Sequence, residues 1–204
     1  MTFGADSYRN SHLNLVHEVG HLIGLPDLYP LHGGADEVGC WDIMSDIFHA
    51  RSFLGWHHHK NGWLDASRKT YVGQDRRGWV TTLHPLDAPE GLSMIVAPVD
   101  DPARPGKVLV VEPAPPVLGT DRSLGGEGIL VYSVDATVGS GDSPLVVIPR
   151  ATGPDGTFGH LFQAPYGVGD VAEVSEKSGA WLRVEVRSRR ADAYEVELSY
   201  LPPH

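Results

Sequence analysis

The chain has 204 residues, 41% of them hydrophobic, and a formal net charge of -10 at pH 7, which suffices for a packed core but argues against a nucleic-acid partner bound through clustered Lys and Arg. Its single cysteine, Cys40, excludes an intrachain disulfide and any Cys-x-x-Cys metal or redox motif. No apolar run approaches the roughly 18 residues that a membrane-spanning helix needs, so we expect no membrane association.

The first predicted element is a helix that ends near Gly24 and carries two histidines four residues apart. His17 and His21 share one helix face, so both imidazoles can reach one metal ion. Glu18 lies about 100° around the helix and can sit beside a water on the metal without being a ligand. This HExxH pattern is typical of zinc hydrolases. The alternative is an amphipathic helix whose histidines are ordinary surface or core residues.

Gly24 and Pro26 predict a chain reversal directly after this helix, because glycine permits a left-handed turn and proline prevents the helix from resuming. Asp27, six residues after His21, would lie roughly 9 Å further along the axis if the helix continued. A reversal can bring it back. We therefore expect a metal site of two neutral imidazoles and one carboxylate, with a fourth position open to water.

Residues 1–67 are predicted to form a helical domain and residues 68–204 a β-rich one. The helical part continues with a Gly-rich loop over 32–39 and a second helix from about 47 to 56. The run His57-His58-His59 suggests a metal cluster, but consecutive side chains diverge on a helix or a strand. We interpret it as a solvated surface run.

Short β-branched runs with period-two patterning recur from about residue 71 onward. The predicted strands are 79–83, 94–97, 108–112, 129–134 and 145–148. Residues 181–187 and 194–200 alternate and should form a terminal hairpin. Because Pro and Gly separate these strands, we expect an antiparallel β-sandwich or barrel-like domain, and hence an α+β fold class for the whole chain.

The stretch from His17 to Tyr29, HEVGHLIGLPDLY, closely resembles the immune inhibitor A-like branch of bacterial secreted metalloproteases in the metzincin clan, where Asp replaces the last His of the motif. Trp41-Asp42-Ile43-Met44 is similar to the WD-x-M segment of that family. Weaker similarities follow in the expected order, at 54–56, 60–64 and 108–135.

The resemblance implies zinc ligands His17, His21 and Asp27, the general base Glu18, and Met44 as the methionine of the turn beneath the metal. It implies a zinc-dependent endopeptidase acting on protein or peptide substrates in the extracellular space, although the sequence contains no signal peptide. Only 16 residues precede His17, too few for the sheet and helix found there in the family. The helical part is therefore expected to correspond to the C-terminal part of a metzincin-like catalytic domain, lacking its N-terminal half.

The alternative function is a non-catalytic, zinc-stabilised β-sandwich that binds a partner, derived from such a protease. The short N-terminal segment favours this alternative, whereas the intact Glu18 favours the enzyme. Calcium is a second candidate cofactor, because oxygen-rich loops such as Asp100-Asp101 can bind that ion. Their spacing matches no calcium-loop motif, and the alternative is a solvated turn. Oligomeric state and substrate sequence preference stay open.

Overall fold

The computed structural model describes residues 11–34, 36–49, 51–73, 76–99, 106–118, 126–150, 161–175 and 181–201, and every structural statement concerns these. They form two helices, α1 (Ser11–Leu22) and α2 (Gly55–Lys60), with single 3-10 turns at Gly39–Trp41, Ala66–Arg68 and Leu161–Gln163. The strands are β1 (Lys69–Tyr71), β2 (Trp79–Leu83), β3 (Met94–Pro98), β4 (Lys107–Pro113), β5 (Ile129–Asp135), β6 (Leu145–Val147), β7 (Val171–Ser175), β8 (Trp181–Arg190) and β9 (Ala193–Leu201).

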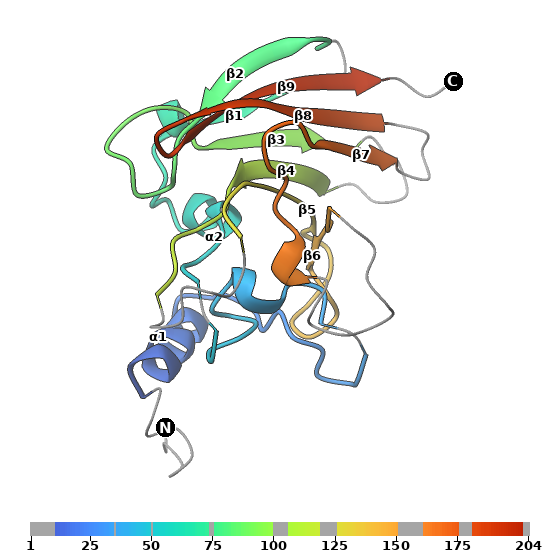
Figure 1. The fold of residues 1–204 in the computed structure, drawn as a ribbon. Helices are drawn as coiled ribbons and strands as arrows, with labels where there is room; N and C mark the ends of the chain where they lie inside the picture. Colours follow the sequence, from blue (N-terminus) through green and yellow to red (C-terminus); the bar gives the residue numbers. More distant parts are fainter. Residues whose placement is uncertain are drawn as a thin grey trace.

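The strands build two sheets, in the orders β1-β3-β4-β5-β6 and β2-β9-β8-β7, which lie one above the other in Figure 1. All neighbouring strands pair antiparallel except β1 and β3, which are parallel. The expected α+β class is confirmed. The barrel-like alternative is wrong, because within the described residues neither edge strand of one sheet pairs with a strand of the other.

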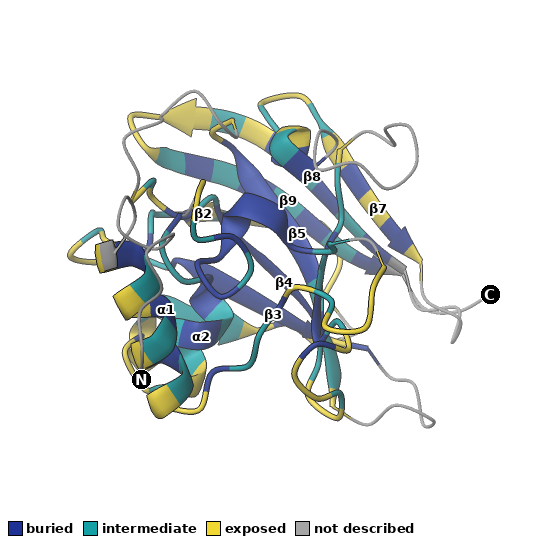
Figure 2. Cartoon of the chain, turned by 90° about the horizontal axis from the view of Figure 1, so that it is seen from below, coloured by how far each residue is buried: buried dark blue, intermediate teal, exposed yellow. Residues whose placement is uncertain are grey.

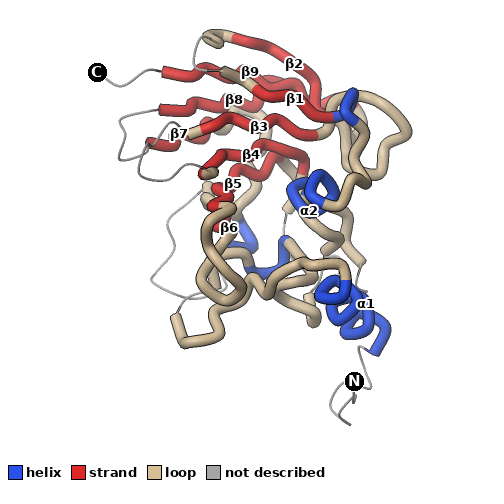
Figure 3. Tube along the Cα trace, turned by 180° about the vertical axis from the view of Figure 1, so that it is seen from behind, coloured by secondary structure: helices blue, strands red, loops and turns tan. Residues whose placement is uncertain are grey.

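The first sheet is the middle layer of the molecule, between the second sheet and a layer of helices and loops (Figure 3). Along β3, Met94 and Val96 belong to the core on the loop side, whereas Ile95 and Ala97 belong to the core between the sheets. This division follows from the alternation of side chains along a strand. Because both faces of this sheet are covered, β4 and β5 are dark blue along most of their length in Figure 2. The loop-side core contains residues from both sides of residue 67.

The predicted strands from 79 to 148 and the terminal hairpin are confirmed, the hairpin as the antiparallel pair β8–β9. Sequence reasoning missed β1 and β7, which are short. Among the described helices, none is long and apolar enough to cross a membrane.

The second helix was predicted too early, and the prediction for 47–56 is wrong: α2 begins at Gly55. The backbone N–H groups before Gly55 hydrogen-bond to residues that are distant in the sequence, not to the preceding turn of a helix. Arg51 donates its N–H to the Cys40 carbonyl (3.1 Å), and Ser52 donates to Pro116 (2.9 Å). Because these N–H groups are already bonded elsewhere, the segment gains nothing from forming a helical turn.

The histidine run is also not a solvated surface. His57 is buried, with Nδ1 2.9 Å from the Asp42 carboxylate. His58 packs edge-on against Trp63, at 5.5 Å between ring centroids, and burial lowers the pKa of His58. The three rings do diverge, so no metal cluster forms from them.

Glu112 is a fully buried carboxyl of β4 that meets the start of α2. Its Oε1 accepts the Gly55 N–H at 2.9 Å, and a Cβ on residue 55 would collide with the carboxylate. Burial raises the pKa of Glu112 to about 8. In the folded protein this group therefore holds its proton at pH values where the unfolded chain has lost it.

We expect Glu112→Gln to be more stable than the parent protein at pH 8, by a margin that shrinks towards pH 5. Between about pH 4.5 and about 8 the folded state binds more protons at this site, so parental stability falls as pH rises. Glutamine keeps the acceptor for Gly55 but cannot ionise. Urea unfolding across this pH range measures the difference, with the exposed Glu90→Gln as control; a margin that does not change with pH would contradict it.

Candidate metal centre

Helix α1 ends in a Schellman turn. Gly24 has φ +86°, its N–H donates to the His21 carbonyl at 3.0 Å, and the Leu25 N–H donates to the Gly20 carbonyl at 3.0 Å. This turn is the predicted chain reversal. It returns Asp27 to the face of α1 that carries His17 and His21.

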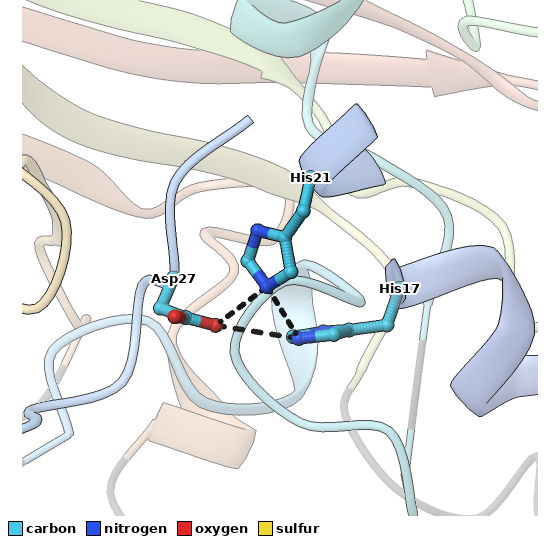
Figure 4. Close-up of side chains that lie close together, drawn as sticks. All are labelled: His17, His21 and Asp27. Carbon is cyan, nitrogen blue, oxygen red and sulfur yellow. Dashed lines mark hydrogen bonds and ion pairs between the residues drawn. The ribbon is translucent and has the colours of Figure 1, made fainter. Parts of the chain in front are cut away.

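Figure 4 shows the three side chains converging on one point. The two Nε2 atoms are 3.1 Å apart, and Asp27 Oδ1 lies 3.3 Å from His17 Nε2 and 3.1 Å from His21 Nε2. Ligand atoms about 2.0–2.1 Å from a tetrahedral zinc are roughly 3.3 Å from one another. The observed triangle is therefore close to one face of such a tetrahedron, whose fourth corner is available for another ligand.

The hydrogen bonds of both rings fix which nitrogen faces the centre. His17 Nδ1 lies 3.0 Å from the Ile43 carbonyl, and His21 Nδ1 lies 2.9 Å from the Leu25 carbonyl. A carbonyl only accepts, so each Nδ1 carries the proton and each Nε2 presents a lone pair to Asp27.

Three electron-rich atoms thus meet at one point, where Asp27 Oδ1 is buried without a hydrogen-bond donor. A single added proton can bridge only one pair of them, whereas a central cation contacts all three. The residues fit a metal ion, and two imidazoles with one carboxylate are a donor set that zinc accepts.

Met44 lies directly beneath the helix, fully buried. A Cβ on Gly20 would lie 2.5 Å from Met44 Sδ, so the close approach needs glycine there. The Met44 carbonyl accepts the Leu28 N–H at 3.0 Å, which ties this turn to the segment that carries Asp27. Met44 therefore packs against the helix that carries His17 and His21, and its role in a turn beneath a metal ion stays a prediction.

Asp27 is also held by a segment more than a hundred residues away. Its N–H donates to Ser140 Oγ at 2.9 Å, and its carbonyl accepts the Gly141 N–H at 3.1 Å. Both partners lie in the connection between β5 and β6. Nothing in the local sequence pattern indicated this contact.

Tyr29 is a site residue that sequence reasoning missed. Its ring stacks on His17, at 6.3 Å between centroids and 24° between planes. Its hydroxyl hydrogen-bonds to Asp27, and burial followed by the Asp27 charge raises the pKa of Tyr29. The signal that could have found it is its position two residues after a metal ligand.

Glu18 is half-buried and faces a pocket of about 810 Å³ together with His17 and Tyr29. It is not part of the triangle formed by His17, His21 and Asp27. Across the described ranges, the triangle is the one group of three or more potential ligand side chains. The proposed calcium loop at Asp100-Asp101 lies outside the described residues.

No protein-family model, curated protein or solved structure matches this chain.

We expect Tyr29→Phe to weaken zinc binding about 10- to 100-fold, the range seen when a partner that orients a metal ligand is lost. The ring still stacks on His17, so the change isolates the hydroxyl on Asp27. Competition with a chromophoric zinc chelator measures the affinity. Tyr71→Phe, an exposed tyrosine whose hydroxyl meets His59, is the control, and equal affinities of all three proteins would contradict the role.

We expect Gly20→Ala to reduce the free energy of unfolding by about 1–2 kcal/mol, because displacing the buried Met44 outweighs the better helix propensity of alanine. Urea unfolding of the zinc-loaded protein measures this. Gly139→Ala is the control, since a Cβ there meets nothing within 4 Å. A variant as stable as the parent would show that Met44 moves freely.

Proposed function

We propose that this chain is a zinc-dependent endopeptidase that hydrolyses peptide bonds in extracellular proteins, similar to the immune inhibitor A-like metalloproteases. The observation that carries the proposal is the triangle of three ligand atoms with a glutamate next to it on an open pocket. A purely structural metal site has no need of a carboxylate in that position.

A bound zinc would polarise the carbonyl of the peptide bond and lower the pKa of a water molecule there. His17, His21 and Asp27 would hold the ion. Glu18 would accept the proton of that water and deliver it to the leaving amine, as general base and then general acid.

Asp27 influences how much Glu18 must contribute. A carboxylate ligand leaves the ion less positive than a third neutral imidazole would, so water at the metal is less acidic. The hydrogen bond from Tyr29 withdraws some of that negative charge from the carboxylate. Tyr29 thereby moderates the effect of the aspartate.

The second candidate is a non-catalytic, zinc-stabilised module that binds a partner through this face. The outward side of α1 favours it, because that side exposes a stripe of apolar residues: Leu15, Val16, Val19, Leu22 and Ile23. Exposed apolar patches of this kind mark interaction surfaces.

We expect Glu18→Gln to keep its zinc and to lose hydrolysis of unfolded casein by at least 100-fold, since a general base typically contributes 10²- to 10⁴-fold. His17→Ala should lose the zinc itself, because two ligands do not hold the ion. Zinc content by atomic absorption and casein digestion measure the two effects, with Glu90→Gln as control. Parent protein that binds zinc stoichiometrically yet never cleaves casein would favour the binding module.

A further inference from the structure

The pocket beside Glu18 is large and has an apolar wall. Its volume is about 810 Å³, and it extends from His17 and Glu18 past the turn that follows Met44. The apolar part of the wall is made by Tyr29, Pro30, Ile47, Phe48 and Phe162. A wall of this kind fits the methylene stem of a long side chain.

Two further carboxylates, Asp36 and Asp46, line the same pocket. Asp36 accepts the N–H groups of Val38 and Gly39 at 2.9 and 2.7 Å, and the Ser45 hydroxyl at 2.9 Å. All three donors are neutral. They fix the carboxylate in place without cancelling its charge.

Asp46 accepts a neutral backbone donor and also contacts a histidine. Its Oδ1 accepts the Phe48 N–H at 2.8 Å, and its Oδ2 lies 2.7 Å from His49 Nδ1, an ion-pair contact. The His49 ring stands edge-on to Phe162, at 6.1 Å between ring centroids. No Lys or Arg is among the described residues that line this pocket.

We propose that this pocket receives a basic side chain of the substrate, lysine or arginine, next to the peptide bond that is cut. The inference rests on the proposed function, because it takes the pocket's position beside Glu18 as the position of the substrate. The stem of the side chain lies along the aromatic and aliphatic wall, and its cationic end is near Asp36, Asp46 and His49. An acidic side chain meets the same wall but is repelled by the carboxylates.

Binding to the zinc-loaded Glu18→Gln protein tests the pocket apart from catalysis. Three fluorescent peptides differ at the residues flanking one central bond, which are lysine, norleucine or glutamate. We expect the lysine peptide to bind at least tenfold more tightly than the glutamate peptide at low salt. The norleucine peptide, which has the stem without the charge, should lie between them. The lysine preference should shrink towards 1 M salt, while norleucine binding does not weaken.

Asp46→Asn removes one charge and should reduce the lysine-over-glutamate ratio severalfold, whereas Asp87→Asn, an exposed aspartate away from this pocket, should leave it unchanged. If Asp46→Asn fails to fold, the salt dependence of the unmodified pocket still decides. Equal binding of lysine and glutamate peptides, or tighter binding of glutamate, overturns the proposal even if the parent protein cleaves peptides. Selective binding of lysine without any cleavage by the parent protein supports the pocket and overturns the proposed function instead.

Discussion

The geometry of the candidate metal centre depends on the hydrogen bonds that the buried carboxylate of Asp42 accepts. The loop between the two helices has little regular structure, so its backbone groups need other partners. Asp42 supplies them from a fully buried position: Oδ1 accepts the Met44 N–H at 2.8 Å, and Oδ2 accepts the Leu54 N–H at 2.8 Å. His57, which belongs to α2, contacts the same carboxylate, with its Nδ1 2.9 Å from Asp42 Oδ2. One side chain therefore joins the turn below the metal site to the start of the second helix.

The hydrogen bonds of Asp42 affect the orientation of the His17 ring and the placement of α1. With Met44 fixed, the neighbouring Ile43 carbonyl is placed to accept His17 Nδ1, and that bond turns Nε2 towards the centre. With the Met44 side chain beneath Gly20, α1 is held at a fixed height above the loop. Asp42 thus orients the His17 ring indirectly, through the backbone of Ile43 and Met44.

The sequence was most informative where a requirement is local. Two histidines four residues apart must share a helix face, and a glycine and a proline end the helix, so the convergence of His17, His21 and Asp27 and the chain reversal were predictable. The alternating strands were predictable for the same reason. The position of α2 was not, because long-range partners such as Pro116 hold the backbone of the preceding segment.

Contacts between segments that are distant in the sequence account for the features that the sequence did not predict. The Ser140 hydroxyl that holds Asp27, and the burial of His57 against Asp42, join residues that no periodic pattern relates. Tyr29 is a different case. It lies within the motif from His17 to Tyr29, but its role depends on a stacking geometry that only the folded turn produces. A stacking contact of this kind cannot be predicted from the order of the residues alone.

A metal ion at the triangle would couple metal affinity to the local stability of α1. It has 12 residues, a length at which an isolated helix is marginal in water. Its buried contacts are few, with Leu13 in the core and Gly20 against Met44, while its outward side is exposed. A cation at the triangle would join the helix at His17 and His21 to the chain segment at Asp27. Since the three acceptors repel one another without it, the ion would remove this repulsion, and part of its binding energy would appear as stability of α1.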